Sequence, residues 1–442
     1  MSVSRREFLK GGLIAASGVA AGVGLPRILA AQGKEPIKVG VLHSLSGTMA
    51  ISEGPIKEVV LMAIDEINKS GGVLGRKVEA VVEDPASNWD LFAEKSKKLL
   101  LQDKVACVFG CWTSVSRKSV LPVFEKNNGL LFYPVQYEGE ECSKNVIYTG
   151  ATINQQATPG VDYVMSPEGG NKKKFYLLGS DNVYPRTTNK ILRAYLMKKK
   201  NVPEANIAEE YTPFHHQYYQ TIIGKIKSFG AAGDACVINT LNGDTNVPFF
   251  KELANQGLTA DKIPTMSYSF AEVELQTLDV KPLVGHLASW NYFMSIKSPE
   301  NQKWVKAWKE WAKKAGMSDK QAVTDDPMMH AYVHVKLWAE AVKKAESTDV
   351  DKVLKAVENL QVSSPVGKYK VDAENHHTWK PVFIGKIRED GQFDIVKRTP
   401  EWVRPEPWSS VTYPERGCDW SKGGKGTFDK VQGKRVWLSE KQ

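Results

Sequence analysis

Short apolar runs alternate with amphipathic helical stripes along this chain, and this alternation constrains the fold more than any other feature. Residues 37–45 predict a strand, and apolar positions between Ile56 and Ile67 recur at helical spacing until the glycine pair 71–72. Strand, loop and helix in this order form the repeating unit of a doubly wound α/β domain. The same reading predicts a helix over 91–101 and strands over 77–82, 105–109 and 130–133.

A second series of the same kind begins after Gly150. It predicts helices over 188–197, 218–229 and 247–256, and strands over 174–178, 207–211, 235–240 and 263–268. The length of 442 residues agrees with more than one domain at the usual ~100–200 residues each. The predicted fold class is therefore α/β, with two doubly wound parallel-sheet lobes.

The N-terminus carries a pattern typical of export. The adjacent Arg5 and Arg6 precede a Gly/Ala-rich apolar run over 11–25 and the small residues Ala30 and Ala31. This order predicts a twin-arginine signal peptide over 1–31, cleaved near Ala31, and a mature protein in the periplasm. The run is shorter than the ~18 apolar residues that a membrane span needs, so we do not expect it to remain as an anchor.

Charge and cysteine content exclude some classes of function. The net charge is +9, and losing four basic residues and one acidic residue with the signal leaves +6. The lysine clusters 172–174 and 198–200 flank expected strand or helix ends, where solvated lysines are ordinary, so no nucleic-acid surface is predicted. Five cysteines leave at least one thiol free in the monomer, and folding before export requires no disulfide, although one can form later.

Enzyme machinery is missing from the sequence, although twin-arginine export often serves cofactor-bearing redox proteins. The chain has no GxGxxG, HExxH, CxxC or GxSxG motif. The adjacent pairs His215-His216 and His376-His377 do not place two rings on one face of an element, so we predict surface histidines. The sequence therefore predicts neither a metal site nor a cofactor, and it predicts a protein that is not an enzyme.

Polar and aromatic residues follow the expected strands at the points where the strands end. Trp112, Thr113 and Ser114 follow one strand, Tyr133 ends the next strand, and Gln136 follows it. In the second series the segments 179–183 and 241–245 take the same place. Because the carboxyl ends of parallel strands meet at one edge, these segments predict a small-molecule crevice.

Several ordered segments resemble the substrate-binding proteins of urea ABC transporters, within the branched-chain amino acid and short-chain amide group of type I periplasmic binding proteins. They lie at 37–50, 110–118, 132–139, 148–151, 179–187, 239–246 and 375–381, within a resemblance that spans 37–396. The resemblance implies a first lobe over 32–151 and 285–345, a second over 152–284 and 346–396, and three crossovers between them. It also implies a permease and an ATPase as partners. The segment 397–442 stays unassigned.

The resemblance also implies a ligand pocket. Ser114, Tyr133 and Tyr184 fall on pocket positions of the amide-binding relatives, and Trp112 stands where they have a tyrosine. Val135-Gln136 replaces their Thr-Pro, which favours urea over short amides such as acetamide or formamide. A branched-chain amino acid is the other alternative ligand. An intracellular amide sensor that controls transcription shares the fold, but the export signal argues against it.

Urea has one carbonyl acceptor and four N–H donors, so its site needs many acceptors. Besides the residues above, Asn242, Asp244 and Glu272 are candidates, and Glu272 is preferred to Glu138 because it follows a strand end. Other roles remain open, since Ser114 and Asp244 also fit as helix caps.

Overall fold

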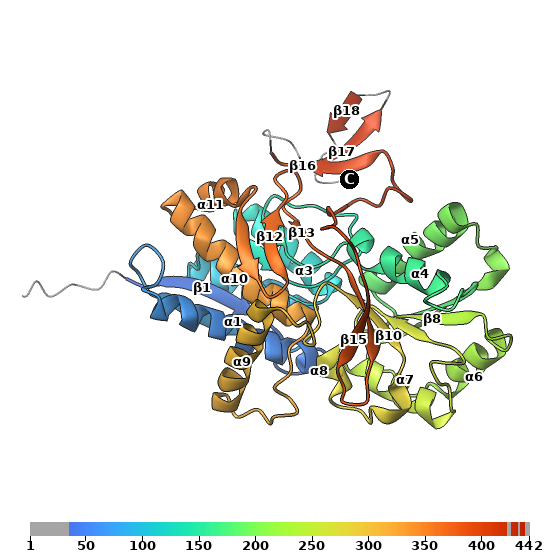
Figure 1. The fold of residues 1–442 in the computed structure, drawn as a ribbon. Coiled ribbons are helices and arrows are strands. Elements are labelled where there is room, and N and C mark those ends of the chain that lie inside the picture. The colour runs from blue at the N-terminus through green and yellow to red at the C-terminus, as the bar shows by residue number, and fades with distance from the viewer. Residues whose placement is uncertain (1–34, 422–425, 432–433, 438–442) are drawn as a thin grey trace, which may run out of the picture. The chain divides into compact units, whose positions relative to one another are not determined.

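Two β-sheets organise the part of the chain that the structure describes, a computed structural model covering residues 35–421, 426–431 and 434–437 (Figure 1). The predicted signal peptide lies outside these residues. Each sheet is built largely from parallel strands, with helices on its faces. We call the two sheets with their helices the first and second lobes.

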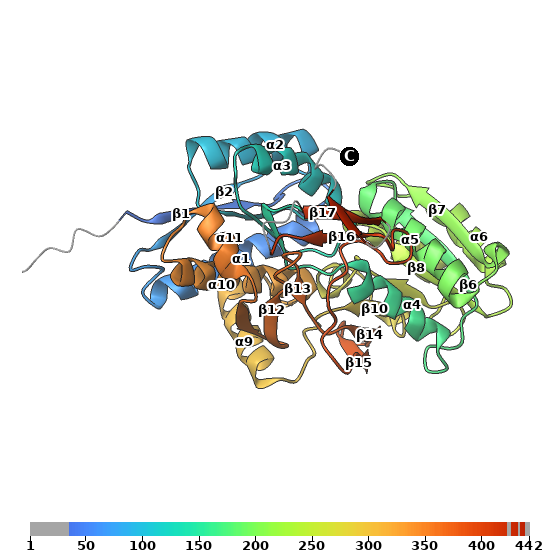
Figure 2. The same ribbon diagram turned by 90° about the horizontal axis from the view of Figure 1, so that it is seen from above.

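The first lobe holds a five-stranded parallel sheet in the order β2-β1-β3-β4-β5. Its strands are β1 (Ile37–Leu42), β2 (Val78–Glu83), β3 (Val108–Gly110), β4 (Leu131–Tyr133) and β5 (Val146–Tyr148). Helices α1 (Ala50–Lys69) and α10 (Asp326–Ala345) cover one face, while α2 (Trp89–Lys97) and α3 (Ser114–Lys126) cover the other (Figure 2). Both faces are covered, which explains why β3, β4 and β5 are buried at every position.

The second lobe holds a seven-stranded sheet in the order β7-β6-β8-β9-β10-β14-β15. The parallel strands are β6 (Lys174–Ser180), β7 (Ile207–Thr212), β8 (Ala235–Thr240), β9 (Thr265–Ser267) and β10 (Leu287–Trp290). Antiparallel β14 (Phe383–Ile387) and β15 (Phe393–Arg398) extend it. Its helices are α4 (Ala157–Met165), α5 (Val183–Lys200), α6 (Gln220–Phe229), α7 (Asn246–Asn255) and the short α8 (Glu272–Leu275).

The chain passes between the lobes three times, after β5, after β10 and before β14. Between the last two passages lie α9 (Pro299–Lys314), α10, α11 (Val350–Val357), β11 (Gln361–Ser364), β12 (Gly367–Val371) and β13 (Thr378–Trp379). Two predicted lobe assignments are wrong. The sequence places residues 287–290 in the first lobe, but they form β10, which pairs with β9 and β14. It places residues 350–371 in the second lobe, but they pack into the core of the first.

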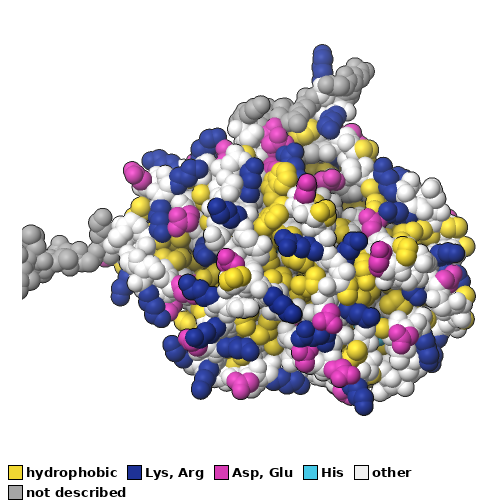
Figure 3. Space-filling view, viewed as in Figure 1, with side chains coloured by type: hydrophobic (Ala, Val, Ile, Leu, Met, Phe, Trp, Pro, Cys, Tyr) yellow, Lys and Arg dark blue, Asp and Glu magenta, His cyan; other side chains and the backbone are white. Residues whose placement is uncertain are grey.

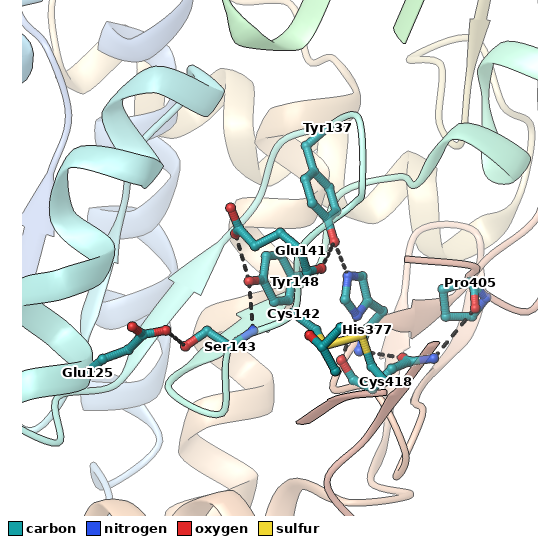
Figure 4. Close-up of a disulfide and its surroundings, with 11 residues drawn as sticks. Glu125, Tyr137, Glu141, Cys142, Ser143, Tyr148, His377, Pro405 and Cys418 are labelled. Atoms are coloured by element: carbon teal, nitrogen blue, oxygen red, sulfur yellow. Dashed lines mark hydrogen bonds between the residues drawn. A yellow bond between two sulfur atoms is a disulfide. The ribbon is translucent and has the colours of Figure 1, made fainter. Parts of the chain in front are cut away.

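The segment beyond β15 forms a further small sheet. β16 (Arg416–Asp419), β17 (Gly426–Val431) and β18 (Lys434–Trp437) pair antiparallel. A disulfide joins Cys142, in the segment between β4 and β5, to Cys418 of β16 (Figure 4). Cys107, Cys111 and Cys236 are buried free thiols.

One histidine pair contradicts the sequence prediction. His215 is exposed as expected, but His376 and His377 are buried. The His377 ring stacks on Tyr148 with centroids 4.2 Å apart, and its Nε2 lies 2.5 Å from the Tyr137 hydroxyl (Figure 4). A loop that reaches back onto β5 buries these rings, and local spacing gives no sign of it.

Charged side chains of both signs are distributed over the face of the molecule seen in Figure 3. On the face seen in Figure 3, lysines and arginines are spread out and interspersed with acidic residues. Among the described residues, no helix combines the length and apolar character required to cross a membrane.

Candidate functional site

The first-lobe side of the candidate site is the turn between β3 and α3. Thr113 caps α3, because its Oγ1 accepts a hydrogen bond of 3.0 Å from the Ser116 amide. Ser114 is therefore not the cap. Its buried hydroxyl instead donates to Glu138 Oε2 at 2.5 Å. Ser114 thus belongs to a polar cluster that includes the residues following β4.

Arg117 lies at the centre of this cluster and is fully buried. Its Nε donates to Glu141 Oε1 at 2.8 Å, and its Nη2 donates to Glu138 Oε1 at 3.2 Å. Burial alone would raise the pKa of Glu141, but the charges of Arg117 and Lys118 hold it well below its ordinary value. The guanidinium charge is thus already balanced by carboxylates of the chain itself.

Tyr133 and Trp112 form the aromatic part of the cluster. The Tyr133 hydroxyl donates to the Trp112 carbonyl at 2.6 Å, and the Arg117 guanidinium lies 4.8 Å from the Tyr133 ring centroid. Both side chains are buried, and the Trp112 Nε1–H has no hydrogen-bond partner. Tyr133 therefore positions the turn, whereas Trp112 retains a free donor.

Gln136 joins the first lobe to the second. Its Nε2 donates to the Tyr268 carbonyl at 2.9 Å and to Ser269 Oγ at 2.8 Å, both just beyond β9. Asn242 Nδ2, beyond β8, donates to the same Ser269 hydroxyl at 3.1 Å. The Gln136 Oε1 is buried without a partner. The strand ends of both sheets thus meet here and leave one buried acceptor unpaired.

Tyr184 supplies an unpaired polar group from the second lobe. It lies in the first turn of α5, which Asn182 caps, and its buried hydroxyl has no hydrogen-bond partner. Burial raises the pKa of Tyr184, the nearby Ser269 and Gln136 oppose this shift, and the Glu138 charge adds to it. Tyr184 therefore lies close to residues of both lobes.

Asp244 lies apart from these groups, at an edge where the lobes touch. Its carboxylate accepts from the Thr48 hydroxyl at 2.5 Å and pairs with His215 at 3.0 Å, and its side chain is 38% exposed. It does not cap α7 through its side chain, since Thr245 holds that position. Asp244 thus fastens the two lobes together.

The neighbouring Gly243 explains how closely the lobes approach at this edge. Its φ is +59°, a conformation that favours glycine. A Cβ at this position would lie 2.6 Å from the Thr48 carbonyl oxygen of the other lobe. Any side chain here would push the lobes apart.

Glu272 also lies outside the cluster around Ser114. Its Oε1 accepts from the Met294 amide at 2.8 Å, while Oε2 is buried and unpaired. Burial raises the pKa of Glu272 to about 8, and the charges of Asp326 and Glu274 add to this shift. The structure brings Glu138, rather than Glu272, next to Ser114.

The sequence prediction missed Arg117 and Ser269 and ranked Glu138 second. Arg117 stands three residues after Ser114, so the two share a helical face, which is a usable signal. Ser269 offered only its position after a strand. Within the residues that the structure describes, no group of three or more His, Cys, Asp or Glu side chains is arranged to hold a metal ion.

Two doubly wound lobes, three passages between them and polar strand ends that face each other define a binding protein of the type I periplasmic fold, which confirms the predicted fold class. The family model described as "Periplasmic binding protein domain" matches residues 37–414. The chain therefore belongs to the periplasmic binding protein family, and this membership implies an extracytoplasmic location.

Curated relatives match different shares of the chain. The Leu/Ile/Val-binding protein homolog 6 of Brucella melitensis is 24% identical over 366 residues, which cover 81% of this chain and 89% of that protein. A stretch of 132 residues, 30% of this chain, is 32% identical to a protein named limonene hydroxylase from Geobacillus stearothermophilus. The match spans only 23% of the latter protein's length.

Solved structures share the fold at low identity. A solute binding protein of an ABC transporter from Rhodopseudomonas palustris HaA2, in complex with p-hydroxybenzoic acid, matches with a TM-score of 0.71 and 21% identity. The match covers 84% of this chain and 98% of that one. An amino acid ABC transporter substrate-binding protein from Pseudomonas fluorescens Pf-5 gives a TM-score of 0.70 at 18% identity, covering 85% and 98%.

Proposed function

We propose that this protein is the extracytoplasmic substrate-binding component of an ABC transporter and that it captures urea between its two lobes. One observation carries the ligand assignment. Near the place where the strand ends of the two lobes meet, three neutral buried groups are left unpaired: Gln136 Oε1, the Tyr184 hydroxyl and the Trp112 Nε1–H.

These groups match the hydrogen-bonding pattern of urea. The Gln136 oxygen and the Glu138 carboxylate accept from urea N–H groups, while the Trp112 N–H and the Tyr184 hydroxyl are donors for its carbonyl. A polar group of the ligand left unpaired in a closed site costs about 1–3 kcal/mol. A mixed set of donors and acceptors therefore favours urea over an apolar ligand of similar size.

Charge separates urea from the other ligands of this fold. The carboxylate of an amino acid or of an aromatic acid needs a cationic or strongly donating partner. Arg117 is already paired with Glu138 and Glu141, so its charge is not free for such a ligand. A branched-chain amino acid or an aromatic acid is the alternative ligand. It is supported by the names of the Brucella protein, which specifies Leu/Ile/Val, and of the Rhodopseudomonas protein, which specifies p-hydroxybenzoic acid.

Transport then requires other subunits. The chain carries no Walker motif, so we expect a separate permease to take the ligand and a separate ATPase to drive its uptake. The twin-arginine segment over 1–31 delivers the folded protein to the periplasm in this proposal. The protein itself acts as a receptor and not as an enzyme.

Isothermal titration calorimetry with urea, acetamide, formamide, leucine and 4-hydroxybenzoate tests the ligand. We expect urea to bind most tightly. Tighter acetamide binding would move the assignment to the short amides, and tighter leucine or 4-hydroxybenzoate binding would refute it. The purified protein should release no ammonia from urea above a heat-inactivated control, and ammonia release would refute the receptor role.

A further inference from the structure

We infer that Glu138 sets the charge selectivity of this site, because it neutralises Arg117 and so keeps the site closed to small planar anions. The inference rests on the proposed function only for the location of the ligand. It concerns anions such as acetate and bicarbonate, which resemble acetamide and urea in size and shape but carry a negative charge.

The geometry singles out Glu138 among the acids of the cluster. Its side chain is 1% exposed, one oxygen accepts from Arg117 and the other accepts from Ser114. Its charge also acts on Tyr184 of the other lobe. Glu138 therefore pairs directly with the buried arginine and lies near enough to act on Tyr184, another group that we assign to the ligand.

Glu141 neutralises the same arginine from another side. Its oxygens accept from Arg117, from Lys118 and from the Tyr148 hydroxyl, which belong to the first lobe. The four charged groups of this cluster, two basic and two acidic, balance each other. The titratable groups around them include the phenols of Tyr133, Tyr137, Tyr148 and Tyr184, the Cys111 thiol and the Glu140 carboxyl, and burial raises the pKa of all six.

The substitution Glu138→Gln isolates the charge because glutamine has nearly the same shape. It leaves the cluster with one positive charge in excess, next to the freed Ser114 hydroxyl and the Arg117 guanidinium. An uncompensated positive charge in a buried cluster is unfavourable even though Arg117 keeps Glu141, so a small anion that reaches the cluster binds more tightly than it does in the parent. An anion in this place substitutes for the lost carboxylate.

The matched control is Glu140→Gln. Glu140 lies two residues away and its loss changes the net charge of the protein equally, but its carboxylate accepts from Thr412 and lies 3.9 Å from Lys190. Glu138→Asp serves as a second variant, because it keeps the charge near Arg117. Neither control should gain anion affinity.

Calorimetry with acetate and bicarbonate, at constant ionic strength, tests the inference in all four proteins. We expect Glu138→Gln to bind at least one of these anions about tenfold or more tightly than the parent, on the scale of a charge-assisted hydrogen bond. Its affinity for urea should fall by a similar factor. If Glu138→Gln is too unstable for calorimetry, acetate should raise its melting temperature while leaving that of Glu140→Gln unchanged.

Two results would overturn the inference. One is a Glu138→Gln protein with no gain in anion affinity or anion-dependent melting temperature. The other is an equal gain in Glu140→Gln, which would show a general effect of net charge. Failure of the parent to bind urea would instead count against the proposed function, and the comparison of anion binding would still decide the role of Glu138.

Discussion

Replacing Tyr184 by Phe removes one hydroxyl group and separates ligand binding from folding. The hydroxyl is buried near Ser269, Gln136 and Thr188, and none of them forms a hydrogen bond of good geometry with it. Its removal therefore breaks no bond of the folded chain, so the stability should change little. If the hydroxyl contacts urea, the variant leaves a polar group of urea unpaired at about 1–3 kcal/mol, which corresponds to about 5- to 150-fold weaker binding.

Tyr133→Phe is the matched control, since it makes the same chemical change in the other site tyrosine. The Tyr133 hydroxyl donates its hydrogen bond to the Trp112 carbonyl within the protein. Losing that buried bond should lower the free energy of unfolding by about 1–3 kcal/mol. We expect urea affinity to change much less than in Tyr184→Phe.

Two measurements on both variants are sufficient. Calorimetry gives the urea affinity, and unfolding by heat or guanidinium chloride gives the stability without using urea as denaturant. The reasoning is refuted if Tyr184→Phe binds urea as the parent does while its stability falls, because the hydroxyl would then have a structural role. It is equally refuted if the two variants lose the same affinity.

Three further changes test other parts of the structure. Gly243→Ala should weaken urea binding because its side chain obstructs the contact between the lobes. Gly257→Ala, which has a similar φ of +65° and open space around it, should leave urea binding unchanged. An equal loss of urea affinity in both variants, measured by calorimetry, would contradict this. Burial raises the pKa of Glu272 to about 8, so the folded protein holds this proton more tightly than the unfolded chain does, and the free energy of unfolding should fall as the pH rises from about 4.5 to 8. Glu272→Gln should make the melting temperature depend less on pH over this range. Replacing Cys142 and Cys418 by serine should lower stability by about 2–5 kcal/mol, matching the parent with reductant; no change would contradict this.

The sequence by itself determined the local elements and their order. The predicted strand over 235–240 coincides with β8 (Ala235–Thr240), and the predicted helix over 247–256 lies within one residue of α7 (Asn246–Asn255). These helices and strands can be predicted from the sequence because hydrophobic periodicity depends only on residues that are close together in the chain. The same logic placed polar residues at the strand ends, where Ser114 and Gln136 lie.

The tertiary structure decided every feature that depends on residues distant in sequence. The largely apolar run that forms β10 would suit the core of either lobe, and only its pairing with β9 and β14 assigns it to the second lobe. Cys142 and Cys418 are separated by 276 residues, and no spacing rule connects them.

The sequence also could not predict which polar side chains of the site bond within the protein and which stay unpaired. Tyr133 ends β4 and Tyr184 lies in the first turn of α5, and both are buried, yet one hydroxyl bonds within the protein and the other is unpaired. Glu138 and Glu272 are both buried acids, but of the two only Glu138 lies against Arg117. Periodicity reveals which side chains turn inward, but the hydrogen bonds of a buried polar group depend on which distant residue faces it, and only the folded chain fixes that partner.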